Sequence, residues 1–191
     1  MNRKTALKGI LGVVTLGLSS GVLYELLKSG HSIPVELLPK KRELIAELTE
    51  LIIPRTDTPG AKDAKVEDFI IKMITENTDT KAQKSFLEGL SSLEQYAYTN
   101  YHKQFVDCKN VEKNDVLKHF EDKGNYSLEI LNKVRKKLFG PPFFYQLRDL
   151  TVQGYCTSLL GATKGMAYDY IPVTYEACIP LRKNQEAWAT K

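Results

Sequence analysis

Apolar residues recur at intervals of three and four through most of the chain after residue 39, and this spacing restricts the fold more than any other feature. Such a rhythm lines apolar side chains along one face of a helix. No two alternating segments flank a hairpin turn, so no sheet is expected. We therefore predict an all-α fold, a compact helical domain over residues 31–191 with helices at 42–53, 66–76, 81–106, 114–121, 128–139 and 143–160.

The last part of the chain does not continue this pattern. Beyond Gly165, tyrosines and prolines alternate with small or polar residues, which predicts an irregular aromatic C-terminal tail lying over a surface. Tyr168, Tyr170 and Tyr175 have large rings with polar tips, the composition that protein interfaces favour. We interpret the tail as a contact surface for a partner protein, with packing on its own domain as the alternative.

The first thirty residues predict a targeting segment. The uncharged apolar stretch 9–24 follows the basic residues Arg3, Lys4 and Lys8, as in a secretory signal. As a helix, this stretch is shorter than a hydrocarbon core of roughly 30 Å. No clear small-residue cleavage site follows it, so a cleaved signal and a retained one-helix membrane anchor both stay open.

The charge of the chain argues against nucleic acid as a partner. The net charge is +4, from 27 Lys and Arg against 23 Asp and Glu. Much of this excess lies in the targeting segment, which leaves the remaining domain close to neutral. A nucleic-acid binder needs a concentrated basic face, so we expect no nucleic acid to bind.

Motifs that hold cofactors or metals are missing from the sequence. There is no glycine-rich dinucleotide fingerprint, no phosphate-binding loop and no paired histidine motif. The cysteines form no C-x-x-C pair. We therefore expect no catalytic residue, cofactor or metal on this chain. For Cys156 and Cys178, a disulfide and two free buried thiols both stay open.

The turn after the first predicted helix carries the one compact polar cluster. Residues 54–62 are rich in Pro and Gly, and Arg55, Thr56 and Asp57 lie together within them. Short polar side chains at such turns commonly bond the nearby backbone. The residues favour a helix-ending turn of this kind over a catalytic one.

Three segments resemble a known family when they are compared in order. Residues 51–61, LIIPRTDTPGA, are similar to the I-I-P-x-T-D-T-P-G-A signature of the gluconate 2-dehydrogenase subunit 3 family. Residues 147–162 resemble its L-T-x-x-G-Y-x-T-S-x-x-G pattern, and residues 168–181 resemble its Y-x-x-x-P-x-x-Y-x-x-C-x-P-L ending. Trp188 stands where a late tryptophan is common. Residues 2–8, NRKTALK, resemble a twin-arginine signal whose second arginine is Lys4.

The resemblance implies a non-catalytic small subunit of a periplasmic or membrane-associated sugar or sugar-acid dehydrogenase. The partner would be a large flavoprotein of the glucose–methanol–choline type that holds FAD, in some cases with a multihaem cytochrome c as third subunit. The small subunit would assist maturation of the flavoprotein and carry it to the periplasm through the twin-arginine translocase, with Arg3 and Lys4 read by the translocase. The residues we predict at the partner interface are Arg55, Asp57, Tyr155, Tyr168, Tyr170 and Tyr175.

A second function remains open from the sequence. The chain could be an independent periplasmic enzyme or binding module, with a site near Asp57 and the 168–181 tail. The absence of any recognisable catalytic constellation favours the subunit.

Overall fold

The computed structural model describes residues 33–124, 140–171, 178, 180, 183 and 185–189. The chain divides into two compact units, Met1–Ser32 and Ile33–Lys191, and all described residues belong to the second. The predicted targeting segment, with Arg3 and Lys4, therefore lies outside the described residues. So do the predicted helix at 128–139 and Tyr175.

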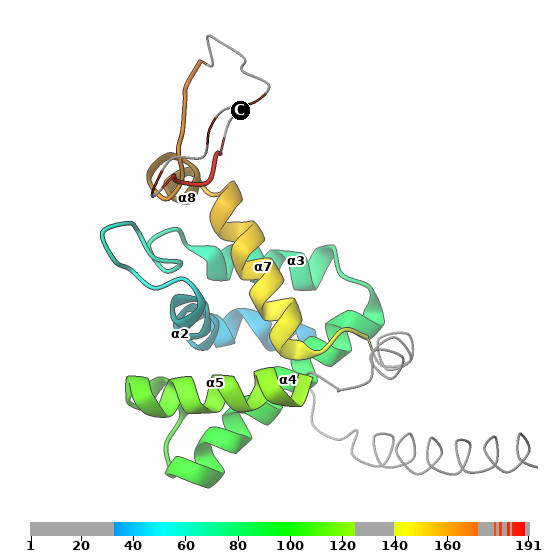
Figure 1. The fold of residues 1–191 in the computed structure, drawn as a ribbon. Helices are drawn as coiled ribbons and strands as arrows, with labels where there is room; N and C mark the ends of the chain where they lie inside the picture. Colours follow the sequence, from blue (N-terminus) through cyan, green and yellow to red (C-terminus); the bar gives the residue numbers. More distant parts are fainter. Residues whose placement is uncertain are drawn as a thin grey trace, which may run out of the picture. The chain divides into compact units, whose positions relative to one another are not determined.

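The described part of the chain is helical, which confirms the all-α prediction (Figure 1). The only β-type pairing there is one isolated bridge between Ala167 and Trp188. None of the described helices is long and apolar enough to cross a membrane. In chain order the elements are the 3-10 helix η1 (Val35–Lys41), α2 (Arg42–Ile52), α3 (Val66–Glu76), α4 (Thr80–Tyr101), the 3-10 helix η2 (Phe105–Asp107), α5 (Asn110–Gly124), α7 (Phe143–Thr157) and α8 (Leu159–Lys164).

Helix α7 is the central element of the domain and packs against α2, α3, α4 and α5 (Figure 1). Its Phe143 ring lies 5.2 Å from the ring of Phe86 on α4 and 6.0 Å from that of Phe120 on α5. Burial of such apolar side chains is the main favourable contribution to folding. The side chains that are less than 2% exposed include Leu38, Ile45, Leu48, Ile70, Ile74, Phe86, Leu90, Leu93, Val116 and Leu147.

Two glycines allow α7 to approach its neighbours closely. A Cβ atom at Gly89 on α4 would lie 2.2 Å from the Cβ of Phe143. On α7 itself, a Cβ at Gly154 would lie 2.7 Å from the ring of Phe69 on α3. Both distances are shorter than any van der Waals contact, so these positions need glycine for its lack of volume.

The helix ends correct two of the sequence predictions. The predicted helix 81–106 ends at Tyr101, because His102 adopts a left-handed conformation with φ of 54° and closes the helix. The predicted helix 143–160 is two helices. Ser158 is extended between them, and its hydroxyl oxygen accepts a 2.9 Å hydrogen bond from the Gly161 amide, so that it caps α8.

Helix α5 is longer than the predicted 114–121 segment. It begins at Asn110, where the Glu112 carboxylate accepts a 2.7 Å hydrogen bond from the Lys109 amide and holds the first turn. The polar composition of this turn hides it from a search based on apolar spacing. By contrast, α3 has the predicted bounds, and α2 ends one residue early, before Pro54.

Candidate functional site

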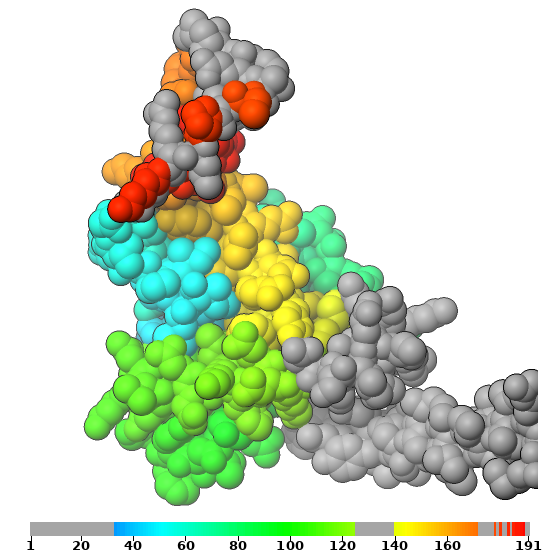
Figure 2. Space-filling model, in the orientation of Figure 1, coloured from blue at the N-terminus to red at the C-terminus, as the bar shows by residue number. Residues whose placement is uncertain are grey.

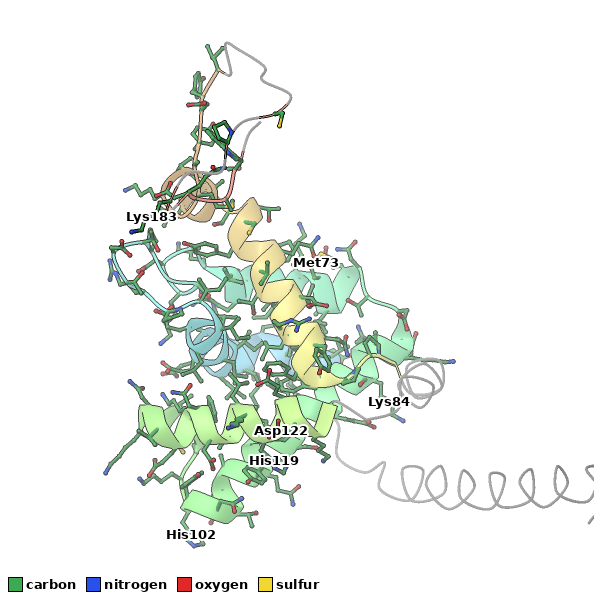
Figure 3. All side chains as sticks on the ribbon, in the orientation of Figure 1. Met73, Lys84, His102, His119, Asp122 and Lys183 are labelled. Atoms are coloured by element: carbon green, nitrogen blue, oxygen red, sulfur yellow. The ribbon has the colours of Figure 1, made fainter. Side chains whose placement is uncertain are left out.

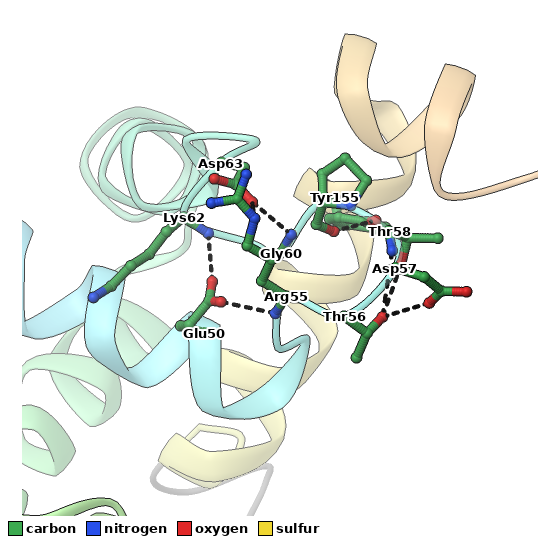
Figure 4. Close-up of polar contacts among 10 residues, drawn as sticks. Glu50, Arg55, Thr56, Asp57, Thr58, Gly60, Lys62, Asp63 and Tyr155 are labelled. Carbon is green, nitrogen blue, oxygen red and sulfur yellow. Dashed lines mark hydrogen bonds and ion pairs between the residues drawn. The ribbon is translucent and has the colours of Figure 1, made fainter.

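The polar loop at residues 54–61, between α2 and α3, is held from beneath by one carboxylate (Figure 4). Glu50, in the last turn of α2, accepts a 2.8 Å hydrogen bond from the Arg55 amide and a 2.9 Å hydrogen bond from the Lys62 amide. Each carboxylate oxygen thus receives one backbone N–H, and hydrogen bonds to a charged acceptor are stronger than neutral ones. The two ends of the loop are fixed to the same side chain.

Gly60 and Asp63 complete the support of this loop. The Asp63 carboxylate accepts a 3.0 Å hydrogen bond from the Gly60 amide. A Cβ atom at Gly60 would lie 2.5 and 2.6 Å from the two carboxylate oxygens of Glu50. Gly60 does not have a positive φ, so the position needs glycine for space rather than for backbone freedom.

The exposed tip of the loop carries Arg55, Thr56 and Asp57, the cluster that the sequence singled out. The Thr56 hydroxyl donates a 2.9 Å hydrogen bond to Asp57 Oδ1. Arg55 Nε lies 3.3 Å from Asp63 Oδ2, with the Arg55 side chain 72% exposed. The cluster is a helix-ending turn, as the residues favoured, but its backbone is held mainly by Glu50 and Asp63 rather than by Asp57.

Tyr155, which we predicted at the partner interface, lies inside the fold instead. Its side chain is buried, and its hydroxyl donates a 2.7 Å hydrogen bond to the Pro59 carbonyl. A Cβ atom at Gly165 would lie 2.3 Å from that hydroxyl. Tyr155 therefore holds the 54–61 loop against α7, and the interface prediction is wrong for its side chain.

Several exposed apolar side chains follow the C-terminal end of α7 in the chain. Tyr168, Tyr170 and Ile171 are 39%, 85% and 69% exposed, and Leu159 on α8 is 78% exposed. The bridge at Ala167 and Trp188 contains two 2.9 Å hydrogen bonds, from Ala167 N to Ala187 O and from Ala189 N to Ala167 O. Figure 2 shows the cyan loop next to the orange segment that includes α8. We refer to Leu159, Tyr168, Tyr170, Ile171 and Trp188 as the apolar end surface.

A charged network joins the loop to α5. Glu47 on α2 accepts hydrogen bonds from Lys62 and from Lys113, the latter at 2.7 Å. The Lys113 side chain is only 8% exposed. Burial of Glu47 opposes its ionisation, but the two lysines outweigh this effect and lower the pKa of its carboxyl group. Three elements thus meet at Glu47.

The cysteines do not form a bond in the structure. Cys156 and Cys178 are exposed free thiols, whereas Cys108 is buried and its thiol donates to the Gln104 carbonyl at 3.4 Å. One alternative left open by the sequence was that Cys156 and Cys178 are free thiols buried in the fold. That alternative is wrong about burial, because both thiols are exposed. A disulfide between Cys156 and Cys178 in the exported protein stays the alternative that the sequence left open.

In the part of the chain that the structure describes, no three His, Cys, Asp or Glu side chains are grouped as metal ligands. Two of the histidines lie on α4 and α5, away from the loop (Figure 3). His102 ends α4, and His119 stacks on Tyr96 with ring centroids 4.1 Å apart. The described polar contacts around the 54–61 loop mainly fix its backbone, through the carboxylates of Glu50 and Asp63.

Sequence reasoning missed Glu47, Glu50 and Lys113. One signal was available, because Glu50 stands in the last turn of α2, where the helix dipole disfavours a negative charge. A carboxylate in such a position is expected to bind hydrogen-bond donors outside the helix. For Glu50 these donors are the backbone amides of Arg55 and Lys62.

A comparison with protein-family models decides the affiliation of the chain. The model described as gluconate 2-dehydrogenase subunit 3 matches residues 39–173. The chain belongs to the gluconate 2-dehydrogenase subunit 3 family. Comparisons with curated proteins and with solved structures gave no match. The subunit 3 match covers the 54–61 loop, α7, α8 and the start of the tail, so it contains both the loop and most of the apolar end surface.

Proposed function

We propose that this chain is the non-catalytic small subunit of a FAD-dependent sugar or sugar-acid dehydrogenase. The observation that carries the proposal is the match to the subunit 3 family over residues 39–173. The large subunit would be a flavoprotein of the glucose–methanol–choline type, with FAD bound there and haem c on a third subunit where one is present. The chain itself would contribute contacts rather than chemistry.

The surface of the domain supports a role in binding a partner protein. The apolar end surface exposes aromatic and aliphatic side chains, the tip of the 54–61 loop is charged and exposed, and the loop lies next to the segment that includes α8 (Figure 2). Interfaces combine apolar and aromatic contacts with polar groups of this kind. A flavoprotein seated on this end would cover side chains that the fold of the small subunit leaves exposed.

The N-terminal segment supports a role in export. Arg3 and Lys4 stand before the apolar stretch 9–24, in an arrangement similar to a twin-arginine signal. We propose that the translocase reads this signal and delivers the folded small subunit together with its flavoprotein to the periplasm. In the complex, the small subunit would also assist maturation of the flavoprotein.

Purification of the full-length tagged chain from its native host tests the assembly. We expect a large second subunit in near-equal amount, with a flavin absorbance spectrum in the eluate and dehydrogenase activity on sugars or sugar acids. Chain that purifies alone without flavin would contradict the subunit role. Turnover by this isolated chain would favour the independent periplasmic enzyme instead.

Substitution of the signal tests the export role. Arg3→Ala combined with Lys4→Ala should leave both this chain and the flavoprotein in the cytoplasm when cells are fractionated. Lys8→Ala is the matched control, because it removes a positive charge of the same segment outside the paired position. A flavoprotein that reached the periplasm without this chain would contradict the escort role.

A further inference from the structure

We propose that the 54–61 loop is a preformed docking loop, which presents Arg55 and Asp57 to a partner surface carrying the opposite charges, and that Glu50 is the residue that positions it. The inference rests on the proposed function, since the partner is the flavin dehydrogenase subunit. It adds the charges that the partner surface must carry and the residue that positions the loop for binding.

The loop is held mainly by side chains outside its tip, and the tip adds a long 3.4 Å hydrogen bond from the Thr58 amide to the Thr56 hydroxyl. Glu50 holds the amides of Arg55 and Lys62, Asp63 holds that of Gly60, and Tyr155 holds the Pro59 carbonyl. All three supporting side chains come from outside the tip. The backbone that carries Arg55 and Asp57 is therefore ordered before any partner arrives.

The charged groups at the tip have capacity left for a partner. The Arg55 side chain is 72% exposed and meets Asp63 through Nε at 3.3 Å, a surface pair of the kind that contributes little to stability. Most of the surface of its guanidinium group is therefore open to a partner. Asp57 is an exposed residue, and its Oδ1 accepts the hydrogen bond of the Thr56 hydroxyl.

These groups specify the partner by charge. A guanidinium fork matches a carboxylate in two-pronged geometry, so the partner should carry Asp or Glu opposite Arg55. Asp57 should face a Lys or Arg. An ordered loop loses less conformational freedom on binding than a flexible one. The support by Glu50 therefore favours affinity, and it also fixes where Arg55 and Asp57 meet the partner.

Gly60 provides a way to disturb Glu50 without removing its charge. A Cβ atom there would lie 2.5 Å from Oε1 and 2.6 Å from Oε2 of Glu50, and 2.7 Å from the amide nitrogen of Arg55. Gly60→Ala should therefore separate the Glu50 carboxylate from the Arg55 amide, while Glu50→Gln leaves the side chain in place with a weaker acceptor. If Glu50 positions the loop, both changes damage one and the same interaction.

The first experiment measures binding of the full-length chain to the flavin-containing large subunit that co-purifies with it. Arg55→Glu and Asp57→Lys should each weaken the affinity about tenfold or more, with most of the effect on association and greater at low salt. The control is Lys84→Glu with Glu88→Lys, which reverses an exposed ion pair on α4 away from the loop (Figure 3) and should bind as wild type does.

The outcomes separate this inference from the proposed function. If wild type binds the flavoprotein and both charge reversals bind equally well, the docking loop is wrong and the subunit role stands. A control pair that weakened binding as much as the loop variants would also overturn the loop's specific role. If wild type holds no flavoprotein, the subunit role and the docking loop both fall.

The second experiment tests Glu50 through amide hydrogen exchange and affinity together. Glu50→Gln and Gly60→Ala should each speed exchange at the Arg55 and Lys62 amides and weaken flavoprotein binding, while Glu43→Gln, an exposed change on the same helix, does neither. The double variant should lose no more affinity than the worse single variant, because coupled sites are not additive. Faster exchange with unchanged affinity, or additive losses, would overturn the positioning role.

Discussion

The hydroxyl of Tyr155 donates a 2.7 Å hydrogen bond to the carbonyl of Pro59, a residue 96 positions earlier in the chain. This contact joins α7, the central helix, to the 54–61 loop. The first two family-like segments of the sequence are thus one structural unit. The position of the loop therefore depends on the packing of α7.

Tyr155→Phe should loosen this junction while leaving the core filled. Loss of the hydroxyl leaves the Pro59 carbonyl without its donor, and a hydrogen bond of this kind contributes about 1 kcal/mol to stability. We expect a fall in melting temperature of roughly 2–4 °C for a domain of this size. Thermal unfolding of the full chain checks it, and an unchanged melt would mean that water replaces the lost donor at no cost.

Gly89→Ala should destabilise the protein although alanine is the better helix former by about 1 kcal/mol. The new Cβ would lie 2.2 Å from the Cβ of Phe143, so α4 and α7 would have to separate. Overpacking of a core typically costs about 1–3 kcal/mol. Chemical denaturation measures the free energy of unfolding, and a variant more stable than wild type would show that the two helices can shift freely.

Glu47 should give the protein an acid-sensitive contribution to stability. Its pKa is lowered from 4.5 in the folded state, so the folded protein binds fewer protons there than the unfolded chain. Its stabilisation is therefore complete above the unfolded pKa and is lost as the pH falls through the folded pKa. The difference in unfolding free energy between wild type and Glu47→Gln should be constant near neutral pH and shrink in acid. A pH-independent difference would contradict this reasoning.

The three cysteines should differ in their reactivity. In the reduced native protein, a maleimide should modify the exposed Cys156 and Cys178 but not Cys108, which is buried and whose thiol pKa burial raises. Mass spectrometry after proteolysis identifies the modified sites, and denaturation should expose the third. Protein taken from the periplasm without reductant tests the open pairing, because a bond between Cys156 and Cys178 would protect both.

Helix positions were predictable where apolar residues face one core, and less so where a single residue ends a helix. The pattern in α3 is complete, and its bounds agree with the structure. The spacing of apolar residues did not predict the left-handed conformation of His102 or the extended conformation of Ser158, because both depend on local backbone geometry rather than on periodicity. The polar first turn of α5 was hidden for the same reason.

The candidate site was predictable at its tip but not at its base. Arg55 and Asp57 stood out as a polar cluster in a turn, and both are exposed. Position 60 needs glycine because the carboxylate of Glu50, on another element, lies too close for a Cβ atom. No local sequence pattern predicts such a contact. Tyr155 was predicted at the partner interface, but its side chain is buried and its hydroxyl is used within the fold.

The bridge between Ala167 and Trp188 has a consequence for how the chain can lengthen. Because the two residues lie side by side, the bridge closes a loop in the chain at this place. Closing a loop costs entropy that grows only slowly with length, by about 0.6 kcal/mol for each doubling. Sequence inserted between these two residues should therefore cost the fold of the helices little free energy, since the bridge still closes the loop at the same two residues.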